Sequence, residues 1–431
     1  MTVQHSAVID QSIVDSVHHV ARGARTASRE LALLTRAQKD EALLAMADAL
    51  DANAEAIATA NSEDLDRGRS GGMPQNLLDR LTFGTDRVAE SADGLRAVAG
   101  LPDPVGEIVR GSRLANGLQI RQVRVPMGVV GMIYEARPNV TVDAAGLGLK
   151  SGNAVILRGG SAAASTNAAS VRVMRDALAG LGLPPDAVNL LSGGGRDSGR
   201  ALMTARGLVD LVIPRGGADL ITTVVAESTV PVIETGIGNC HVYCDAAADV
   251  DMAVAIVVNA KTHRTSVCNA AESLLVHAGI AEAVLPAIMK EFAEAGVTVH
   301  GDEAMGRYAR AVGTAYQPIT DADDDTEFLS LDISARVVPD IDAALRHVQE
   351  HTSAHSEAIV TQDRAASQRW IAEIDAAAVL VNASTRFTDG GEFGFGAEIG
   401  ISTQKLHARG PMALPELTST KWVVEGQGQI R

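Results

Sequence analysis

The residue in this sequence best suited to covalent chemistry is Cys268. It stands in the segment Arg264-Thr265-Ser266-Val267-Cys268-Asn269, which the flanking apolar patterns place between a helix and a strand. The thiolate is the nucleophilic form of cysteine, and nearby positive charge together with turn amides lowers a thiol pKa. Because this segment supplies both, Cys268 is a candidate nucleophile. The alternative is a small buried apolar residue, a common role for a lone cysteine.

Two glycine-containing segments are candidates for binding phosphate. Each follows a short apolar run and precedes a helical stretch: Arg158-Gly159-Gly160-Ser161 and Arg215-Gly216-Gly217. Free backbone amides and the helix dipole favour an anion there, and an arginine adds a fixed charge. A tight turn without a ligand is the alternative for the first segment. The Gly-rich segment 192–199 looks like a dinucleotide loop, but no acidic residue follows about 20 positions later, so that role is not favoured.

The remaining cysteines, Cys240 and Cys244, flank His241 with a C-x3-C spacing. No second ligand pair follows, and Val242 and Tyr243 have the character of a strand interior, so we do not expect a metal site. Three cysteines in a long chain also argue against a disulfide framework.

The elements that must position these residues begin with a helical region. Apolar residues recur at helical spacing from Val14 to Asp64, and a second helical stretch runs from Gln75 to Val98. Between residues 109 and 125, apolar and polar residues alternate around Asn116-Gly117, which predicts a β-hairpin. Such a hairpin has little to pack on within its own chain, so we expect it to contact a second copy.

Short apolar runs then alternate with helical stretches in two successive series. The first series predicts strands at 128–134, 154–157, 188–191, 208–213 and 230–233, with helices at 142–150 and 165–179. The second predicts strands at 272–276, 335–338, 357–360 and 377–381, with helices at 250–259 and 281–295. This alternation is typical of parallel, doubly wound sheets, which bind ligands beyond the carboxyl ends of their strands. We expect a cleft between the two domains, and a solvated loop at the acidic run 321–325.

The composition limits the classes of function. A chain of 431 residues is too long for one ordinary core, and with only 3% aromatic residues Ala, Val, Ile and Leu must build its cores. The net charge of −16 repels nucleic acid and anionic lipid at long range. No apolar run approaches the roughly 18 residues of a membrane span, and the N-terminus is unlike a signal peptide. We therefore expect a cytoplasmic protein that binds neither nucleic acid nor membrane.

Five motifs occur in order along most of the chain, from the hairpin to Trp422. They are Tyr134–Asp143, Glu234–Tyr243, Val267–Ala270, Val381–Phe387, and Gly394–Thr403 followed by Leu406–Pro411. With Glu234 and Cys268 separated by 34 positions (268 − 234), the sequence resembles the aldehyde dehydrogenase superfamily. Within that superfamily it is similar to the branch that reduces an acyl phosphate of glutamate in proline biosynthesis.

The resemblance implies an α/β fold, aldehyde dehydrogenase-like, with two doubly wound α/β domains and an oligomerisation β-hairpin. Residues 1–108 and 126–239 would form the NADP-binding domain, and residues 240–403 the catalytic domain. Residues 109–125 and 404–431 would form the hairpin and oligomerisation element.

The implied reaction is the NADPH-dependent reduction of L-glutamate 5-phosphate to L-glutamate 5-semialdehyde, with release of phosphate through a thioester on Cys268. The backbone amide of Cys268 and the side-chain amide of Asn139 would bind the oxyanion. Glu234 would shuttle a proton, help to set the cofactor pose, or be structural, because a reductase must keep water from the thioester.

The resemblance also implies which residues bind the cofactor and the substrate. Arg158 would bind the 2′-phosphate that distinguishes NADPH from NADH. The other expected cofactor contacts are Gly159, Gly160, Ser161, Arg215, Gly216, Gly217, Glu327 and Phe328. The substrate-binding candidates are Arg137, His355, Ser384, Thr385 and Arg386.

Two alternative functions remain open at this point. One is another aldehyde dehydrogenase-like enzyme, either aldehyde-oxidising or CoA-acylating. The other is a non-catalytic scaffold that binds the preceding kinase of the pathway. We expect a homo-oligomer, and because an acyl phosphate is labile, contact with a glutamate 5-kinase is a sensible expectation.

Overall fold

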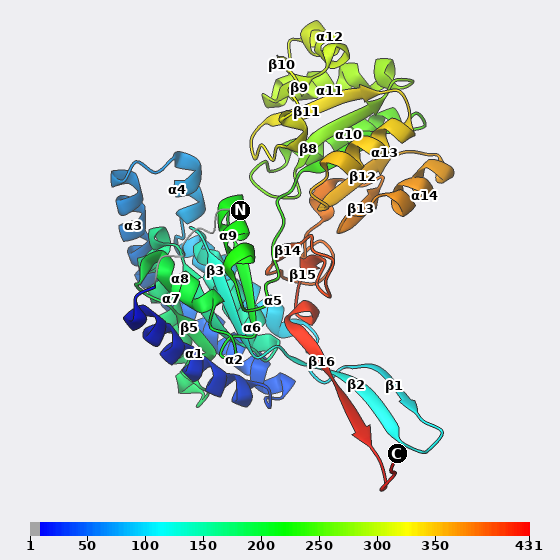
Figure 1. Cartoon of the computed structure of the whole chain (residues 1–431). Helices are drawn as coiled ribbons and strands as arrows, with labels where there is room; N and C mark the ends of the chain where they lie inside the picture. Colours follow the sequence, from blue (N-terminus) through cyan, green and yellow to red (C-terminus); the bar gives the residue numbers. More distant parts are fainter. Residues whose placement is uncertain (1–8) are drawn as a thin grey trace. The chain divides into compact units, whose positions relative to one another are not determined.

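The computed structural model describes residues 9–431, which form two compact units (Figure 1). Unit 1 contains the described residues up to Thr235 together with Gly394–Gly400 and Met412–Arg431. Unit 2 contains Gly236–Phe393 and Ile401–Pro411. Residues 1–8, which the expected first domain included, lie outside the described part of the chain.

Unit 1 is built on a four-stranded parallel sheet. Its strand order is β5 (Val188–Leu190), β4 (Ala154–Gly159), β3 (Val129–Tyr134) and β6 (Leu211–Arg215). In chain order, β4 pairs with one edge of β3 and β5 pairs with β4. The later strand β6 then pairs with the other edge of β3, which is the doubly wound arrangement. All six residues of β3 are buried, as expected for a central strand covered on both faces.

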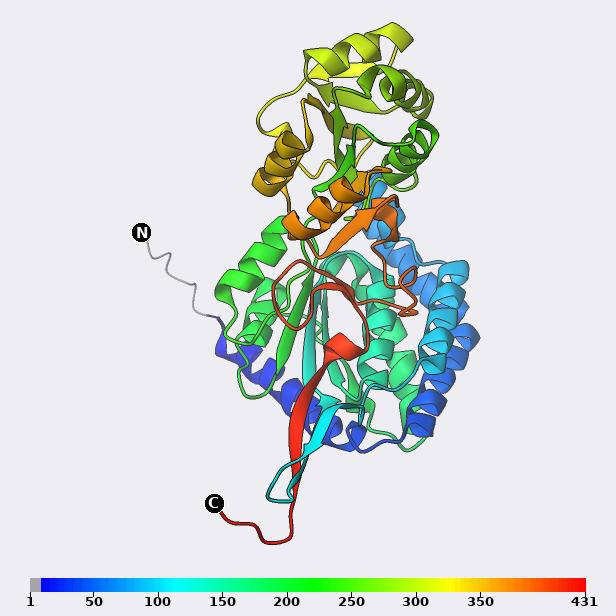
Figure 2. The ribbon, with the colours of Figure 1, turned by 90° about the vertical axis from the view of Figure 1, so that its right-hand side faces the viewer.

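Helices cover both faces of this sheet (Figure 2). One face packs against α6 (Pro138–Lys150) and α7 (Ala164–Gly180), and the other against α1 (Gln11–Leu31), α8 (Gly195–Met203) and α9 (Ala218–Glu227). A further helical layer consists of α2 (Arg36–Ala52), α3 (Ala54–Ser70), α4 (Gln75–Leu81) and α5 (Thr85–Gly100). α6 begins four residues before its predicted start, because Pro138 suits the first helical position, where its missing N–H is not needed.

The predicted hairpin is confirmed as β1 (Ile108–Arg113) and β2 (Gln119–Pro126). The amide of Leu114 donates to the carbonyl of Leu118 at 2.8 Å, and Gly117 takes the left-handed φ of 89° that this turn requires. A strand far along the chain, β16 (Thr418–Glu425), pairs antiparallel with β2 to complete a three-stranded sheet.

Unit 2 contains a seven-stranded parallel sheet. Its order is β10 (Ala315–Pro318), β9 (Thr298–Gly301), β11 (Asp332–Val338), β8 (Ala271–His277), β7 (Cys240–Cys244), β12 (Ser356–Val360) and β13 (Ala378–Val381). One face packs on α10 (Val250–Thr262), α11 (Ala281–Ala295) and α12 (Glu303–Val312), and the other on α13 (Ile341–His351) and α14 (Arg364–Glu373). With both sheets parallel and covered on both faces, the predicted α/β fold class is confirmed.

Two local predictions were wrong. The strand expected at 230–233 is reduced to a single bridge between Val212 and Val232. The acidic run 321–325 is not simply solvated, because Asp324 is 5% exposed and its carboxylate binds the guanidinium of Arg336. A buried carboxylate needs such a partner, and the partner lies 12 positions further along the chain (336 − 324), in β11.

The chain passes between the units several times near its end, so the units differ from the expected domain limits. Residues 236–239 and 404–411 lie in unit 2, and residues 394–400 lie in unit 1. The amide of Gly236 donates to the carbonyl of Ile401, whereas Arg215 donates to the carbonyl of Ile399. The segment that contains β14 (Gly400–Ser402) and β15 (Gly410–Met412) therefore belongs partly to each unit: Ile401–Pro411 is in unit 2, and the residues on either side of it are in unit 1.

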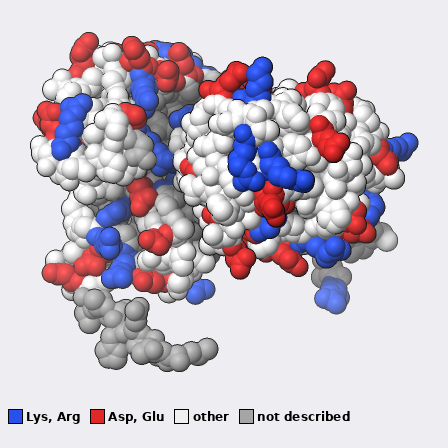
Figure 3. Space-filling view, turned by 90° about the horizontal axis from the view of Figure 1, so that it is seen from above, with Lys and Arg blue, Asp and Glu red and all other residues white. Residues whose placement is uncertain are grey.

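Acidic and basic side chains are interspersed on the surface that Figure 3 shows. This mixture is the distribution expected of a chain with both signs and a net charge of −16. Over residues 9–431, every helix is too short or too polar to cross a bilayer.

Candidate active site

Cys268 lies in the turn that joins α10 to β8, where sequence reasoning placed it. Its side chain is partly exposed, whereas Asn269 and Ala270, which follow it, are buried. Cys240, the first residue of β7, pairs with Ala271, the first residue of β8, so the turn is at the amino-terminal edge of the unit 2 sheet. A parallel sheet usually binds its ligand at the other edge, so this position could not be read from the strand pattern.

Gly238 fixes the position of the Cys268 backbone from one side. A β-carbon on Gly238 would lie 1.5 Å from the carbonyl oxygen of Cys268 and 2.7 Å from its α-carbon. Only a residue without a side chain permits this approach of two backbone segments. The amide of Gly238 in turn donates to a carboxylate oxygen of Glu327 at 2.8 Å. Glu327, which we predicted to contact the cofactor, therefore holds the segment that supports the cysteine.

Three further hydrogen bonds fix the turn from the other sides. Cys240 Sγ donates to the carbonyl of Cys268 at 3.1 Å, and the hydroxyl of Thr385 donates to the carbonyl of Asn269 at 2.7 Å. The side-chain amide of Asn269 donates to the carbonyl of Thr388 at 2.9 Å. Burial raises the pKa of the Cys240 thiol well above its ordinary value, so Cys240 remains a neutral donor. The turn therefore presents a partly exposed cysteine on a backbone that hydrogen bonds hold from several sides.

The predicted substrate residues of unit 2 surround this turn. Arg386 is partly buried, and its Nε donates to His263 Nδ1 at 3.3 Å. Burial lowers the pKa of the Arg386 guanidinium, while the charges of Asp389 and Cys268 act in the opposite direction, which places Arg386 within electrostatic reach of Cys268. By contrast, Ser384, Thr385 and His355 are all less than 5% exposed.

A buried ion pair lies beneath the same region. Lys261 and Glu272 form a salt bridge, and both side chains are fully buried. Burial raises the pKa of Glu272 to about 7, and it lowers the pKa of Lys261. Glu272 also accepts a hydrogen bond from the amide of Leu329, next to the predicted cofactor residue Phe328. Phe328 itself contacts the ring of His300, with the ring centroids 4.9 Å apart.

In unit 1 the candidate phosphate residues gather at the carboxyl edge of the sheet, as predicted. Arg158 extends from β4 and donates to the carbonyl of Gly195, at the start of α8. Burial and the nearby charge of Arg196 both lower the pKa of Arg158. Two guanidinium groups and a glycine loop therefore meet in the same place. Sequence reasoning did not favour a ligand role for that loop, because its spacing departs from the dinucleotide pattern.

The glycines after Arg158 have different surroundings. A β-carbon on Gly159 would lie 2.3 Å from Asn167 Nδ2, so its place in a crowded core requires glycine. Gly160 and Ser161 open the 3-10 turn Ser161–Ala163 that leads into α7. Their predicted contact with a phosphate remains a prediction.

The second phosphate segment is occupied by a protein carboxylate. The amide of Gly217, at the start of α9, donates to Glu135 at 2.9 Å, and a β-carbon on Gly216 would lie 2.7 Å from the same oxygen. Arg215 donates to the carbonyl of Ile399 at 3.1 Å. The anion preference of this helix start is therefore real, and a cofactor phosphate there would take the place of Glu135.

Asn139, the predicted oxyanion donor, is exposed in the first turn of α6. Its side-chain amide donates to Asp143 Oδ2 at 3.1 Å, one helical turn further on. Burial raises the pKa of Asp143 to about 6, while the Asn139 hydrogen bond and the charge of Arg215 act in the opposite direction. Arg137 immediately precedes this helix, and Glu234 is partly buried beside β6, two residues after the bridge at Val232.

Sequence reasoning missed three residues that the structure brings to these places: Gly238, Asp143 and Arg196. Gly238 and Asp143 were part of the quoted motifs but carried no role of their own. Spacing was a possible signal for Asp143, because positions i and i+4 share one face of a helix. The contact of Gly238 with Cys268 joins residues 30 positions apart (268 − 238) and had no local signal.

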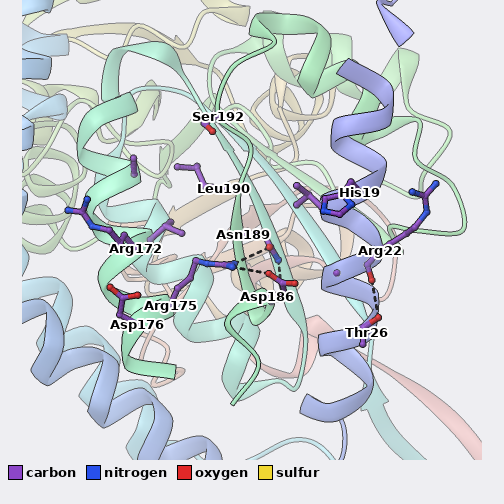
Figure 4. A pocket seen from close by; sticks show the side chains of 14 residues that line it. His19, Arg22, Thr26, Arg172, Arg175, Asp176, Asp186, Asn189, Leu190 and Ser192 are labelled. Carbon is purple, nitrogen blue, oxygen red and sulfur yellow. Dashed lines mark hydrogen bonds and ion pairs between the residues drawn. The ribbon is translucent and has the colours of Figure 1, made fainter. Parts of the chain in front are cut away.

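One cavity has none of the candidate catalytic residues in its wall. It has a volume of about 670 Å³ and lies in unit 1 between α1, α7 and β5 (Figure 4). Arg175 lines this cavity, and its guanidinium donates to Asp186 at 2.9 Å and to the Asn189 side chain at 3.1 Å. These contacts bind α7 to the edge strand, which is a structural role.

No disulfide and no metal cluster occurs between residues 9 and 431. None of the three cysteines is part of a disulfide. His, Cys, Asp and Glu side chains do not gather there in a group of three or more that could hold a metal ion.

Comparison with known proteins finds relatives over nearly the whole chain. A sequence model of the aldehyde dehydrogenase family matches residues 2–309. A gamma-glutamyl phosphate reductase from Thermobifida fusca is 59% identical over 415 residues, covering 96% of this chain and 98% of the relative.

Solved structures agree with this match. The crystal structure of gamma-glutamyl phosphate reductase from Thermotoga maritima is 44% identical, with a TM-score of 0.92 over 96% of this chain and 99% of that one. An acetylating aldehyde dehydrogenase from Geobacillus thermoglucosidasius, 20% identical, has a TM-score of 0.71 over 99% of this chain and 100% of that one, which shows a shared fold.

Proposed function

The chain belongs to the aldehyde dehydrogenase family and, within it, to the gamma-glutamyl phosphate reductases, and from this premise we propose that Cys268 is its nucleophile and NADPH its reductant. Enzymes of this kind reduce L-glutamate 5-phosphate to L-glutamate 5-semialdehyde in proline biosynthesis. The observation that carries the proposal is the support of Cys268: its backbone is held by Gly238, Cys240 and Asn269 while the residue stays partly exposed.

The Cys268 thiolate attacks the acyl carbon of the substrate, the bond from that carbon to the phosphate oxygen breaks, and an acyl thioester forms. A nicotinamide cofactor, when bound, would supply the hydride that reduces this thioester. The resulting tetrahedral oxyanion collapses to release the aldehyde and return the thiolate. A fixed backbone matters here, because a misplacement of about 1 Å can reduce the rate about 100-fold.

Two amides of the chain stabilise the oxyanion in this proposal. They are the backbone N–H of Cys268 and the side-chain amide of Asn139. Asn139 is exposed and its orientation is set by Asp143, as a preorganised donor requires. Such a donor contributes about 3 to 4 kcal/mol of transition-state stabilisation in acyl transfer.

The family implies a nicotinamide cofactor, and the residues near Arg158 fit one that carries a 2′-phosphate. Arg158 and Arg196 place two cations beside each other, which a dianionic phosphate would stabilise. Gly193, Gly194 and Gly195 take left-handed φ values of 88°, 69° and 53°, so this exposed loop offers backbone without side chains to an approaching ligand. We therefore assign Arg158 and Arg196 to the distinction between NADPH and NADH.

Of the substrate candidates, Arg386 is the one we assign to the leaving phosphate, because its guanidinium is partly exposed and lies within electrostatic reach of Cys268. Thr385 holds the nucleophile turn through its hydroxyl. Glu234 keeps its two proposed roles, proton shuttle and cofactor positioning.

We also propose that the protein is a homo-oligomer that acts in the cytoplasm. Trp422 and Val424 on β16 are 51% and 57% exposed, and Arg110 of β1 lies 5.1 Å from the Trp422 ring centroid. An exposed apolar face on a three-stranded sheet is suited to pairing with a second copy. Three cysteines without a disulfide fit a reducing compartment. Contact with a glutamate 5-kinase would protect the labile acyl phosphate.

The test is the reverse reaction, in which L-glutamate 5-semialdehyde reduces NADP only when inorganic phosphate is present. Cys268→Ala should lose several orders of magnitude in kcat and retain cofactor binding. Cys244→Ala is the matched control, because Cys244 is a buried thiol in the core of the same unit. Phosphate-independent turnover, or full activity of Cys268→Ala, would overturn the proposal.

A further inference from the structure

A buried ion pair joins the two ends of the loop that contains Cys268. Lys261 is in the last turn of α10, and Glu272 is the second residue of β8. Their side chains form a salt bridge and are both fully buried. Removing two charges from water is costly, and apolar residues of similar size often fill such a position equally well. Stability alone therefore does not account for this pair.

The second carboxylate oxygen of Glu272 binds a strained segment. Oε1 accepts from the backbone amide of Leu329 at 3.1 Å, whereas Oε2 binds the ammonium of Lys261. Leu329 has a φ of 55°, in the left-handed region that is unfavourable for a residue with a bulky side chain. Its side chain is 37% exposed, so apolar burial does little to hold it there. The hydrogen bond to Glu272 therefore opposes relaxation of this conformation.

This strained segment is joined to the support of Cys268. Glu327 lies two residues before Leu329, and its carboxylate accepts from the amide of Gly238 at 2.8 Å. The backbone of Gly238 packs directly on that of Cys268, because a β-carbon there would lie 2.7 Å from the Cys268 α-carbon. Contacts therefore lead from the ion pair to Cys268, and every residue along them belongs to unit 2.

We propose that Lys261 and Glu272 are positioning residues for Cys268. Glu272 holds the left-handed turn at Leu329, and Lys261 keeps the Glu272 carboxylate directed at that turn. The pair thereby keeps Glu327 bound to the segment that packs on the Cys268 backbone. This inference rests on the proposed function and deepens it. Both residues act on the rate only through the placement of the nucleophile, for which a shift of about 1 Å can cost about 100-fold.

The experiment separates placement from stability with two double variants. The apolar variant, Lys261→Met with Glu272→Leu, removes the ion pair and the acceptor for Leu329. The amide variant, Lys261→Met with Glu272→Gln, removes both charges but keeps an oxygen that can accept from Leu329. The apolar variant should have a thermal midpoint at least equal to that of the amide variant, because it buries no polar group. In the reverse reaction its kcat should nevertheless be about 10- to 100-fold below wild type, whereas the amide variant should stay close to wild type.

Deuterium exchange followed by mass spectrometry measures the same contacts without turnover. In the apolar variant, deuterium uptake should be faster in the peptides that contain Gly238 and Cys268 as well as in the peptide that contains Leu329. In the amide variant all three peptides should stay protected, because the hydrogen bond to Leu329 is kept.

A second buried ion pair of the same design provides the matched control. Lys39 of α2 is fully buried, its ammonium binds Asp103, and that carboxylate also accepts from the backbone amide of Val105 at 2.9 Å. This pair lies in unit 1 and has no assigned role in the reaction. Lys39→Met with Asp103→Leu should leave kcat and the exchange of the Cys268 peptide as in wild type.

Each further outcome decides between these roles. Wild-type kcat in the apolar variant, or the same loss in both double variants, would overturn the inference. Activity that follows the thermal midpoint across the variants would show a purely structural role and overturn it too, as would faster exchange confined to the Leu329 peptide. Full activity of Cys268→Ala would sink the proposed function alone, because exchange in the Cys268 peptide reports the placement of the turn whether or not the sulfur reacts.

Discussion

The backbones of Gly238 and Cys268 are in direct contact: a β-carbon on Gly238 would lie 1.5 Å from the Cys268 carbonyl oxygen. The segment that leads into β7 therefore packs directly against the turn that contains Cys268. Because the contact involves backbone on the Cys268 side, it cannot be relieved by a change of rotamer.

We expect Gly238→Ala to displace the Cys268 turn and to lower kcat at least about 100-fold. The rate of Cys268 alkylation by iodoacetamide and kcat in the reverse reaction should be measured together. Gly94→Ala is the control, since nothing lies within 4 Å of a β-carbon there. Normal kinetics in Gly238→Ala would show that the turn does not depend on this contact.

Arg158→Ala should weaken NADPH binding about 10- to 100-fold and change NADH binding little, because only NADPH carries the 2′-phosphate. The KM values for both cofactors measure this difference. Arg172→Ala removes an exposed arginine beside the unit 1 cavity and should leave both values unchanged. An equal loss with NADPH and NADH would instead point to disruption of the loop that begins α8, whose Gly195 carbonyl Arg158 binds.

Trp422→Glu should lower the oligomeric mass measured by light scattering, because it places a charge on the exposed apolar face of β16. Lys421→Glu changes the neighbouring residue, whose side chain points to the other face of the strand, and serves as the control. The same mass for Trp422→Glu and wild type would exclude this face from the oligomer contact.

Stability should fall in acid through His347. Burial, together with the charge of His241, lowers the pKa of His347 to about 4. Between pH 6.5 and pH 4 the unfolded chain binds a proton that the folded chain does not, so the free energy of unfolding decreases as the pH falls, by about 3 kcal/mol over that window. His347→Gln should reduce this dependence in urea unfolding, whereas His19→Gln, at an exposed position, should not. Identical pH profiles for His347→Gln and wild type would contradict the assignment.

The sequence by itself determined what depends on local pattern. Helical spacing, alternation around Asn116-Gly117 and short apolar runs predicted most helices, the hairpin and the parallel sheets, because each reflects the geometry of one element. The predicted strand at 230–233 became a single bridge at Val232, since pairing depends on a neighbour that an apolar run does not specify. The motif around Cys268 supplied the nucleophile that we propose.

Only the tertiary structure decided the contacts between distant segments. It placed Cys268 at the amino-terminal edge of its sheet, set Gly238 against it, and placed Glu135 at the helix start where a phosphate was expected. It also buried Asp324 against Arg336, although the acidic run predicted a solvated loop. The physical reason is common to all of these: close packing and desolvation depend on which surfaces meet, and that is set by chain topology rather than by the residues adjacent in sequence.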